Sequence, residues 1–235
     1  MPRRLTISTA LATVLLFPPS TPCQAGWRKE TATPGTKITA VPAGTLVDKG
    51  ITVRSYKLRA EGFPKNTKLQ IVMLDLAAND DFQSEGWVVV NDAGDIVAPG
   101  GDDRIFGFAT QDPGETYQIA VINPVDKMSN FVQITPVPLE TRNGPCHLSA
   151  ILAKPSGMAY EIHGDGFESS EKISLSTDAK SLPKWFYAQT ENDGTFLTTV
   201  APHQKRGASG HLKLDVDSKS CKLSLELPWE TPRTK

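Results

Sequence analysis

The chain has 235 residues, 39% of them hydrophobic and 22% charged, and a formal net charge of −1. Charges of both signs are interspersed, so the basic surface that nucleic-acid binding requires is missing and we expect no nucleic-acid partner. The length suits one large or two small domains, and eighteen glycines with eighteen prolines favour many turns between short strands.

Residues 1–25 have the features of a signal peptide that is cleaved on export. Arg3 and Arg4 precede an apolar run over residues 5–17, and Ala25 supplies the small residue that signal peptidase requires. The run is too short to cross the roughly 30 Å core of a bilayer as a helix, so we expect no stable membrane anchor after cleavage. Loss of the two arginines takes the formal charge from −1 to −3. The predicted location is periplasmic or extracellular.

Two alternatives for this leader remain open. Cys23 would be lipidated in a lipoprotein, although the residues before it lack the leucine and the small residue of that signal. The paired arginines would direct twin-arginine export, although no further part of that motif follows. Residues 26–36 are polar and include a proline and a glycine, and we predict that they form a flexible lead-in.

Cleavage leaves two cysteines, Cys146 and Cys221, in a chain that enters an oxidising compartment. We therefore predict a disulfide between them, which joins the first strand of a second domain to its last. The enclosed loop of about 75 residues makes this bond worth on the order of 4 kcal/mol in the chain-entropy model. The alternative is a pair of buried free thiols.

A pattern centred on Gly62 recurs at Gly166, 104 residues later. In both copies apolar residues alternate along a strand, an acidic residue, glycine and phenylalanine follow, and a polar run leads to a second alternating strand. Alternation is typical of a strand with one buried face, and the glycine suits a turn of unusual φ and ψ. A later turn signature also recurs, with Gly94 matched by Gly194. The spacing predicts two similar modules in tandem.

Short predicted strands fill both halves of the chain, with turn residues about every 8 to 12 positions, which is typical of two-sheet sandwiches. We predict an all-β fold with a first β-sandwich at residues 37–135 and a second at 146–229. A proline-rich linker at 136–145 joins them, and no sheet is expected to run through it. Residues 230–235 form a C-terminal tail. The predicted strands are 37–41, 51–60, 68–76, 87–91, 103–110, 116–122, 129–135, 147–153, 158–163, 171–177, 185–190, 195–200, 210–215 and 220–227.

The order of strand, Gly-Phe corner, polar turn, strand and Asn-Asp-Gly turn followed by Phe196 resembles bacterial immunoglobulin-like modules of exported and surface proteins. These include the immunoglobulin-like, plexin and transcription-factor (IPT) type. The resemblance covers nearly the whole mature chain and lies in turn chemistry, and the Cys-Trp-Cys spacing of antibody domains is absent. It implies two tandem immunoglobulin-like β-sandwiches and a habit of binding, without naming a ligand.

The sequence offers no local signature of catalysis or of metal binding. The four histidines show no metal-type spacing, the paired aspartates lack a calcium-loop pattern, and no Gly-x-Ser-x-Gly or phosphate-binding loop occurs. Catalytic residues that converge from distant positions would leave no such signature. We therefore predict a protein that is not an enzyme and that holds no metal or cofactor.

Aromatic residues in polar stretches supply the candidates for a binding surface. Phe82 and Lys184 are predicted to be exposed in long connections of the two modules. Trp87 and Trp185 each begin a run of strand-favouring residues, and we expect both to turn inward. Phe131 lies in an alternating stretch that would suit a template for strand addition.

These features favour a non-catalytic exported protein that binds another envelope or extracellular component, either a protein or a glycan, through loops or a strand edge. Two alternatives stay open. A periplasmic chaperone would join two such sandwiches and hold clients by strand addition. An enzyme acting on cell-wall sugar or peptide would require a cleft with converging carboxylates or a Ser/His pair.

Overall fold

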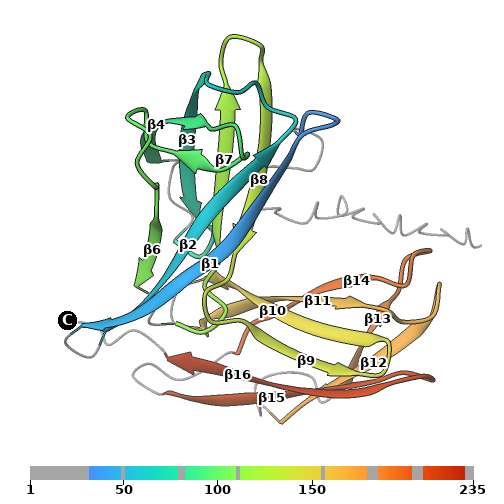
Figure 1. The fold of residues 1–235 in the computed structure, drawn as a ribbon. Coiled ribbons are helices and arrows are strands. Elements are labelled where there is room, and N and C mark those ends of the chain that lie inside the picture. The colour runs from blue at the N-terminus through green and yellow to red at the C-terminus, as the bar shows by residue number, and fades with distance from the viewer. Residues whose placement is uncertain are drawn as a thin grey trace, which may run out of the picture.

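The computed structural model describes residues 32–48, 51–78, 83–109, 112–154, 157–178, 185–202 and 209–230. Within these ranges the chain forms sixteen strands in four antiparallel sheets and no α-helix (Figure 1), which confirms the all-β prediction. No helix in this part of the chain is long and apolar enough to cross a membrane. The predicted signal peptide, with Cys23, and all but the first residue of the predicted C-terminal tail lie outside the described residues.

The first module contains β1 to β8, which form two facing sheets. Their orders are β1-β2-β6 and β5-β4-β3-β7-β8. Side chains from both sheets, among them Leu58, Ile71 and Ile119, are fully buried in one shared core, so the module is a β-sandwich. The strands are β1 (Lys37–Asp48), β2 (Ile51–Glu61), β3 (Lys68–Asp75), β4 (Gln83–Val90), β5 (Ile96–Val97), β6 (Phe106–Ala109), β7 (Tyr117–Asn123) and β8 (Met128–Ile134).

The second module contains β9 to β16, which lie below the first module in Figure 1. Its sheets have the orders β14-β11-β10-β9 and β13-β12-β15-β16. Leu148, Leu175 and Leu214 are fully buried between them. The strands are β9 (Leu139–Asn143), β10 (Cys146–Lys154), β11 (Ala159–Asp165), β12 (Lys172–Thr177), β13 (Trp185–Gln189), β14 (Phe196–Val200), β15 (Ser209–Asp217) and β16 (Lys222–Glu230).

The two modules share a strand order. The series β4-β3-β7-β8 in the first module matches β13-β12-β15-β16 in the second. In each series the first strand along the chain pairs with both the second and the third, which is how the C strand pairs with C′ and F in immunoglobulin-like sandwiches. The strand order therefore agrees with the sandwich class that the sequence predicts.

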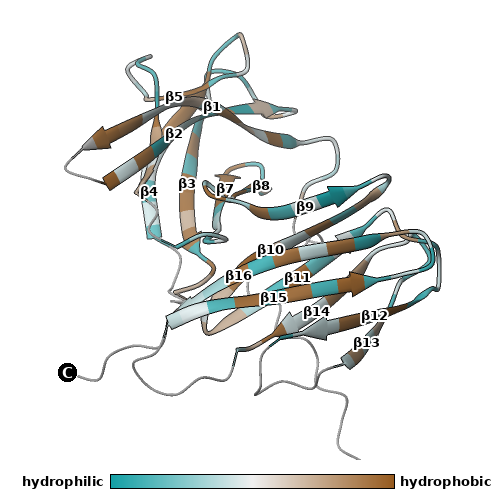
Figure 2. Ribbon diagram, turned by 90° about the horizontal axis from the view of Figure 1, so that it is seen from below, coloured by the Kyte–Doolittle hydropathy of each residue, from teal (hydrophilic) through white to brown (hydrophobic). Residues whose placement is uncertain are grey.

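Period-two hydrophobicity decides which side of each strand faces the core. Along β10 the buried residues Leu148, Ala150 and Leu152 alternate with His147 and Ser149, which face outward. Figure 2 shows the same alternation of hydrophobic and hydrophilic bands on β15. Burial of one face per strand is what holds two sheets together, because backbone hydrogen bonds act only within a sheet.

Gly62 and Gly166 turn the chain at corresponding corners of the two modules. Their φ angles are 75° and 77°, a region that L side chains rarely adopt. A Cβ on Gly62 would overlap the carbonyl oxygen of Gly35, and a Cβ on Gly166 would overlap that of Pro145. The phenylalanine that follows each glycine is buried in the core of its module. Only glycine fits these corners, because both the φ angle and the close backbone approach exclude a side chain.

The later recurring turn also has matching geometry. The amide of Gly94 donates to the carbonyl of Asn91 at 3.0 Å, and the amide of Gly194 donates to that of Glu191 at 3.1 Å. The φ angles of the two glycines are 89° and 77°. The modules therefore agree at two separate turns, as the sequence pattern predicts.

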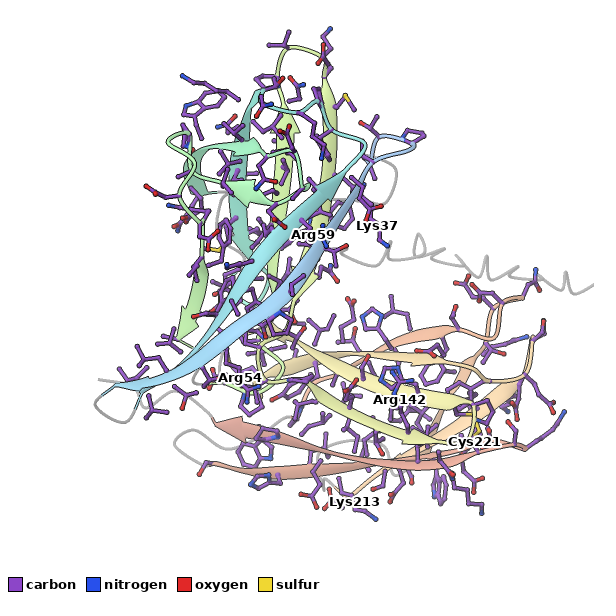
Figure 3. The ribbon with its side chains drawn as sticks, in the orientation of Figure 1. Lys37, Arg54, Arg59, Arg142, Lys213 and Cys221 are labelled. Carbon is purple, nitrogen blue, oxygen red and sulfur yellow. A yellow bond between two sulfur atoms is a disulfide. The ribbon has the colours of Figure 1, made fainter. Side chains whose placement is uncertain are left out.

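The predicted disulfide is confirmed. Cys146 at the start of β10 bonds to Cys221, just before β16, with a Cα–Cα distance of 6.3 Å. Both cysteines are buried, and Figure 3 labels Cys221 at the end of the second module that lies away from the first. The bond ties the two sheets of this sandwich together, because β10 and β16 belong to different sheets.

Part of the predicted linker is a strand, so the expectation that no sheet runs through residues 136–145 is wrong. Residues 139–143 form β9, which pairs with β10. Pro136, Pro138 and Pro145 flank this strand without interrupting it, and β9 is an edge strand, where neighbouring prolines are tolerated.

Two other boundaries differ from the prediction at the start of the first module. Residues 32–36, predicted as part of a flexible lead-in, are hydrogen-bonded to β8, since the Thr33 amide donates to the Ser129 carbonyl at 2.7 Å. The strand predicted to end at residue 41 continues past it, with a register shift between Pro42 and Gly44 inside β1. A bulge absorbs these residues and lets the strand continue to Asp48, because β2 offers partners along its whole length.

The β6–β7 turn of the first module docks on the second module. The amide of Gly114 donates to the carbonyl of Val137, and the amide of Leu152 on β10 donates to the carbonyl of Gly114, both at 2.8 Å. Ala77, which follows β3, is buried in the core of the second module. The two sandwiches are therefore joined by packing and backbone hydrogen bonds as well as by the chain between them.

Candidate functional site

The edge strand β13 presents two aromatic side chains to solvent. Trp185 and Tyr187 are 62% and 61% exposed, whereas Phe186 and Ala188, which alternate with them, pack against the core. The prediction that Trp185 turns inward is wrong. Alternation decides the outcome, because Phe186 and Ala188 fit the buried face and leave the tryptophan on the outer one.

Register arranges the outer face of the β13-β12-β15-β16 sheet in two parallel rows. Each row begins with an aromatic residue on β13, continues with a serine on β12 and ends with an aspartate on β15. Adjacent strands lie about 4.8 Å apart, and the rows are two residues apart along each strand, about 6.7 Å. We call this surface the aromatic rows. They are Trp185, Ser176, Asp215 and Tyr187, Ser174, Asp217.

Lysines of the same face neutralise both aspartates. Lys213 Nζ lies 3.0 Å from Asp215 Oδ1, and Lys222 Nζ lies 3.3 Å from Asp217 Oδ2. Figure 3 labels Lys213 on the outer side of β15. All four side chains are well exposed, so these pairs contribute little to stability. The paired aspartate oxygens can still accept hydrogen bonds from a ligand. The lysines cancel the negative charge of the aspartates, so the surface has no excess charge with which to attract an ionic ligand.

The ammonium group of Lys172 contacts the ring of Tyr187. Lys172 Nζ lies 3.7 Å from the centroid of this ring, a cation–π contact worth about 0.5–1 kcal/mol at an exposed site. The contact covers one ring face and restricts rotation about the side-chain bonds. Because Tyr187 is still 61% exposed, the rest of the ring stays available to a ligand.

The corresponding strand of the first module, β4, does not repeat this aromatic pair within the described residues. Trp87 on β4 is 51% exposed, so the prediction that it turns inward is also wrong. Val88 and Val90 take the buried positions of that strand, which places Trp87 on the outer face by alternation. The next residue on its side of β4 is Val89, so Trp87 is the one exposed aromatic residue among the described residues of this strand.

Of the three surface residues that the sequence predicts, the structure describes Phe131. Phe82 and Lys184 lie outside the described residues. Phe131 is half-buried on β8, an edge strand of its sheet, opposite Ala120. At the start of this edge, both backbone polar groups of Ser129 already bond to Thr33. The Ser129 carbonyl accepts from the Thr33 amide, and the Ser129 amide donates to Thr33 Oγ1 at 2.9 Å. The template for strand addition is therefore partly used by the protein itself.

On the other sheet of the second module, the side chain of His147 connects three strands, β9, β10 and β11. His147 Nδ1 lies 2.9 Å from Asp165 Oδ2, and its Nε2 lies 2.9 Å from Glu140 Oε2. His163 lies 2.7 Å from Glu161. Among the described residues, no group of three or more His, Cys, Asp or Glu side chains is arranged to hold a metal ion. These contacts are consistent with a structural tie between β9, β10 and β11.

Carboxylates gather where the modules meet. Burial raises the pKa of the Glu115 carboxyl, a hydrogen bond with Tyr117 opposes this, and Asp75 and Asp112 raise it further. Burial also raises the pKa of Tyr117, and the bond to Glu115 adds to the shift. Burial and then Asp112 raise the pKa of Tyr160, which links a charge of the first module to a buried hydroxyl of the second.

Comparison with known proteins does not assign the chain to a family. No family model matches it, and no curated protein matches it. Among solved structures, the transglutaminase of red sea bream aligns with 84% of this chain and 31% of its own, at 8% sequence identity and a TM-score of 0.26. The chain thus spans less than a third of that protein, and a likeness at this TM-score supports no inference about function.

Proposed function

We propose that this chain is a non-catalytic exported protein that binds a neutral glycan of the cell envelope or its surroundings. The binding surface is the aromatic rows of the second module. The observation that carries the proposal is the repetition of one set of groups, an exposed aromatic ring, a hydroxyl and a neutralised carboxylate, in two adjacent rows.

This set of groups matches the chemistry of a pyranose ring. A pyranose has an apolar face of C–H groups, which packs on an aromatic ring, and a rim of hydroxyls, which donate and accept hydrogen bonds. Ser174 and Ser176 do both, and Asp215 and Asp217 accept. A protein partner would be expected at an aromatic anchor ringed by apolar contacts that exclude water, whereas these rings have polar neighbours across the strands.

The remaining features suit an exported binding protein of repeated modules. The disulfide fits an oxidising compartment, and the leader sequence fits export. The matched corners and turns support two copies of one immunoglobulin-like ancestor, of which the IPT type is the nearest resemblance in sequence. In this proposal the second copy carries the ligand surface, since within the described ranges its strand β13 places two outward aromatics in succession.

Calorimetric titration of the mature chain with cellohexaose and with chitohexaose tests the proposal. We expect saturable binding of at least one of these neutral oligosaccharides. Replacement of a central aromatic contact costs about 2 kcal/mol, so Trp185→Ala is expected to weaken binding roughly thirtyfold. Tyr187→Ala is expected to act in the same direction.

Trp87→Ala is the matched control, because it removes an equally large exposed ring from the corresponding strand of the other module. It should leave the affinity unchanged. The proposal fails if neither oligosaccharide binds, or if Trp185→Ala and Trp87→Ala weaken binding equally. Release of new reducing ends during the titration would show that the protein is an enzyme.

A further inference from the structure

The first module extends a two-stranded arm beyond its sandwich. β6 pairs with β2 only from Val53 to Tyr56, whereas β1 and β2 stay paired to Asp48 and Ile51 at the far end. Figure 1 shows this arm as the long hairpin that runs past the rest of the module. A hairpin that leaves its sandwich buries neither face against its own core.

Exposed hydrophobic side chains concentrate on this arm and beside it. Leu46 and Val47 are 62% and 66% exposed, and Figure 2 colours the far end of the arm as hydrophobic. This part of the molecule holds five of the eleven large hydrophobic residues that are exposed in the described ranges. They are Val41, Leu46, Val47, Ile51 and Ile105.

Most of these residues share one face of the sheet. Leu46 lies opposite Val53, and Ile51 lies two residues from Val53 on the same strand, so all three point the same way. Val41 lies opposite Lys57, whose side chain also faces outward. Ile105 is exposed immediately before Phe106, which is buried. We call this surface the arm face.

The outer edge of the arm has little of the protection that isolated edges usually carry. Residues 38–47 include no charged side chain, and among the described residues no strand pairs with the outer edge of β1. Edge strands normally avoid association through lysines or other charges. Pro42 and the adjacent bulge interrupt pairing at one point, so association through the face is favoured over simple extension of the sheet.

We propose that the arm face binds the arm face of a second copy of this chain and forms a two-fold dimer. A two-fold interface requires a surface that complements itself. The rim of the arm face meets this requirement, because it holds Lys57 paired with Asp103 and Arg59 paired with Asp95. The two positive charges balance the two negative ones, so a second copy is not repelled, while an acidic or basic partner gains no electrostatic advantage.

Dimerisation would also place two glycan surfaces in one particle. The aromatic rows belong to the second module and share no residue with the arm face, so the two proposals stand or fall separately. A dimer that binds a polymer with both copies gains apparent affinity from effective concentration. Single-chain affinity for a short oligosaccharide is expected to stay the same in the monomeric variant.

Sedimentation velocity of the mature chain, over about two orders of magnitude in protein concentration, tests this inference. We expect a monomer–dimer equilibrium for the native sequence. Leu46→Asp places a charge at the centre of the apolar face and is expected to shift the equilibrium to monomer. Ile105→Asp is expected to do the same from the segment just before β6, which guards against a local effect on the hairpin.

Leu197→Asp is the matched control. Leu197 is 41% exposed on β14 of the second module, remote from the arm in sequence and in sheet. This variant should dimerise as the native protein does. A native chain that stays monomeric throughout the concentration range overturns the inference. A dimer that survives both Leu46→Asp and Ile105→Asp overturns it too, because the interface would then lie elsewhere.

Discussion

Loss of the disulfide should lower the free energy of unfolding of the second module, by an amount that depends on the number of residues between the two cysteines. The bond encloses residues 146–221, a separation of 75. In the chain-entropy model a loop of this length restrains the unfolded chain by about 15 cal/mol/K, or about 4.5 kcal/mol at 25 °C. Folded domains have total stabilities of about 5–15 kcal/mol, so this loss approaches the margin that keeps the module folded.

The assay is urea unfolding of the native protein and of the Cys146→Ala/Cys221→Ala variant, followed by circular dichroism. We expect the free energy of unfolding to fall by about 3–5 kcal/mol, with part of the loss arising from the two small cavities left by the sulfur atoms. Reduction of the native protein under the same conditions provides a second route without a cavity. A loss below about 1 kcal/mol by both routes would refute the entropic argument, since strain in the native bond would then offset its benefit.

Three further changes test the corners, the junction and its charges. In thermal melts, Gly166→Ala should destabilise the protein by well over the 1–2 kcal/mol that positive φ alone costs, because its Cβ would overlap the Pro145 carbonyl. Gly86 has a φ of 97° and open space around it, so Gly86→Ala should show the cost of positive φ alone. Gly114→Ala should lower the melting temperature and increase protease cleavage between the modules, because its Cβ would crowd the contact with the second module; unchanged cleavage would argue against the docked turn. Glu115→Gln should stabilise the protein near neutral pH and have little effect near pH 4. The pKa of Glu115 is raised in the folded protein, so stability is full below the ordinary pKa of about 4.3 and falls as the native carboxyl ionises. A gain in stability that does not depend on pH would contradict the burial argument.

Alternating residues and turn glycines explain why most of the fold was predictable. The corner at Gly166 needs only local information, because both its φ and the phenylalanine behind it follow from neighbours in sequence. The run from Leu148 to Leu152 likewise carries its own periodicity. The disulfide was predictable from export and cysteine number, without knowledge of the fold.

The parts that were missed depend on contacts far along the chain. β9 is polar and follows two prolines, and it is a strand because β10 offers a free edge. Gly114 and Ala77 dock on the second module, and the sequence around each residue does not indicate this contact.

For Trp185 the signal was present in the sequence. The alternation of Trp185 and Tyr187 with Phe186 offers two assignments of the faces, and burial of Phe186 selects the one that exposes the tryptophan. The prediction that Trp185 turns inward rested on its place at the start of a run of strand-favouring residues, which does not show which face of the strand is buried.

Amide chemical shifts of the mature chain, recorded by NMR during titration with chitohexaose or cellohexaose, test the glycan surface most directly. We expect shifts confined to β12, β13 and β15, largest at Trp185 and Tyr187 and their strand neighbours, with the indole N–H of Trp185 among the signals that move. The proposed glycan surface is contradicted if saturating sugar moves no signal, or if the shifts map to the first module while those of β13 stay in place.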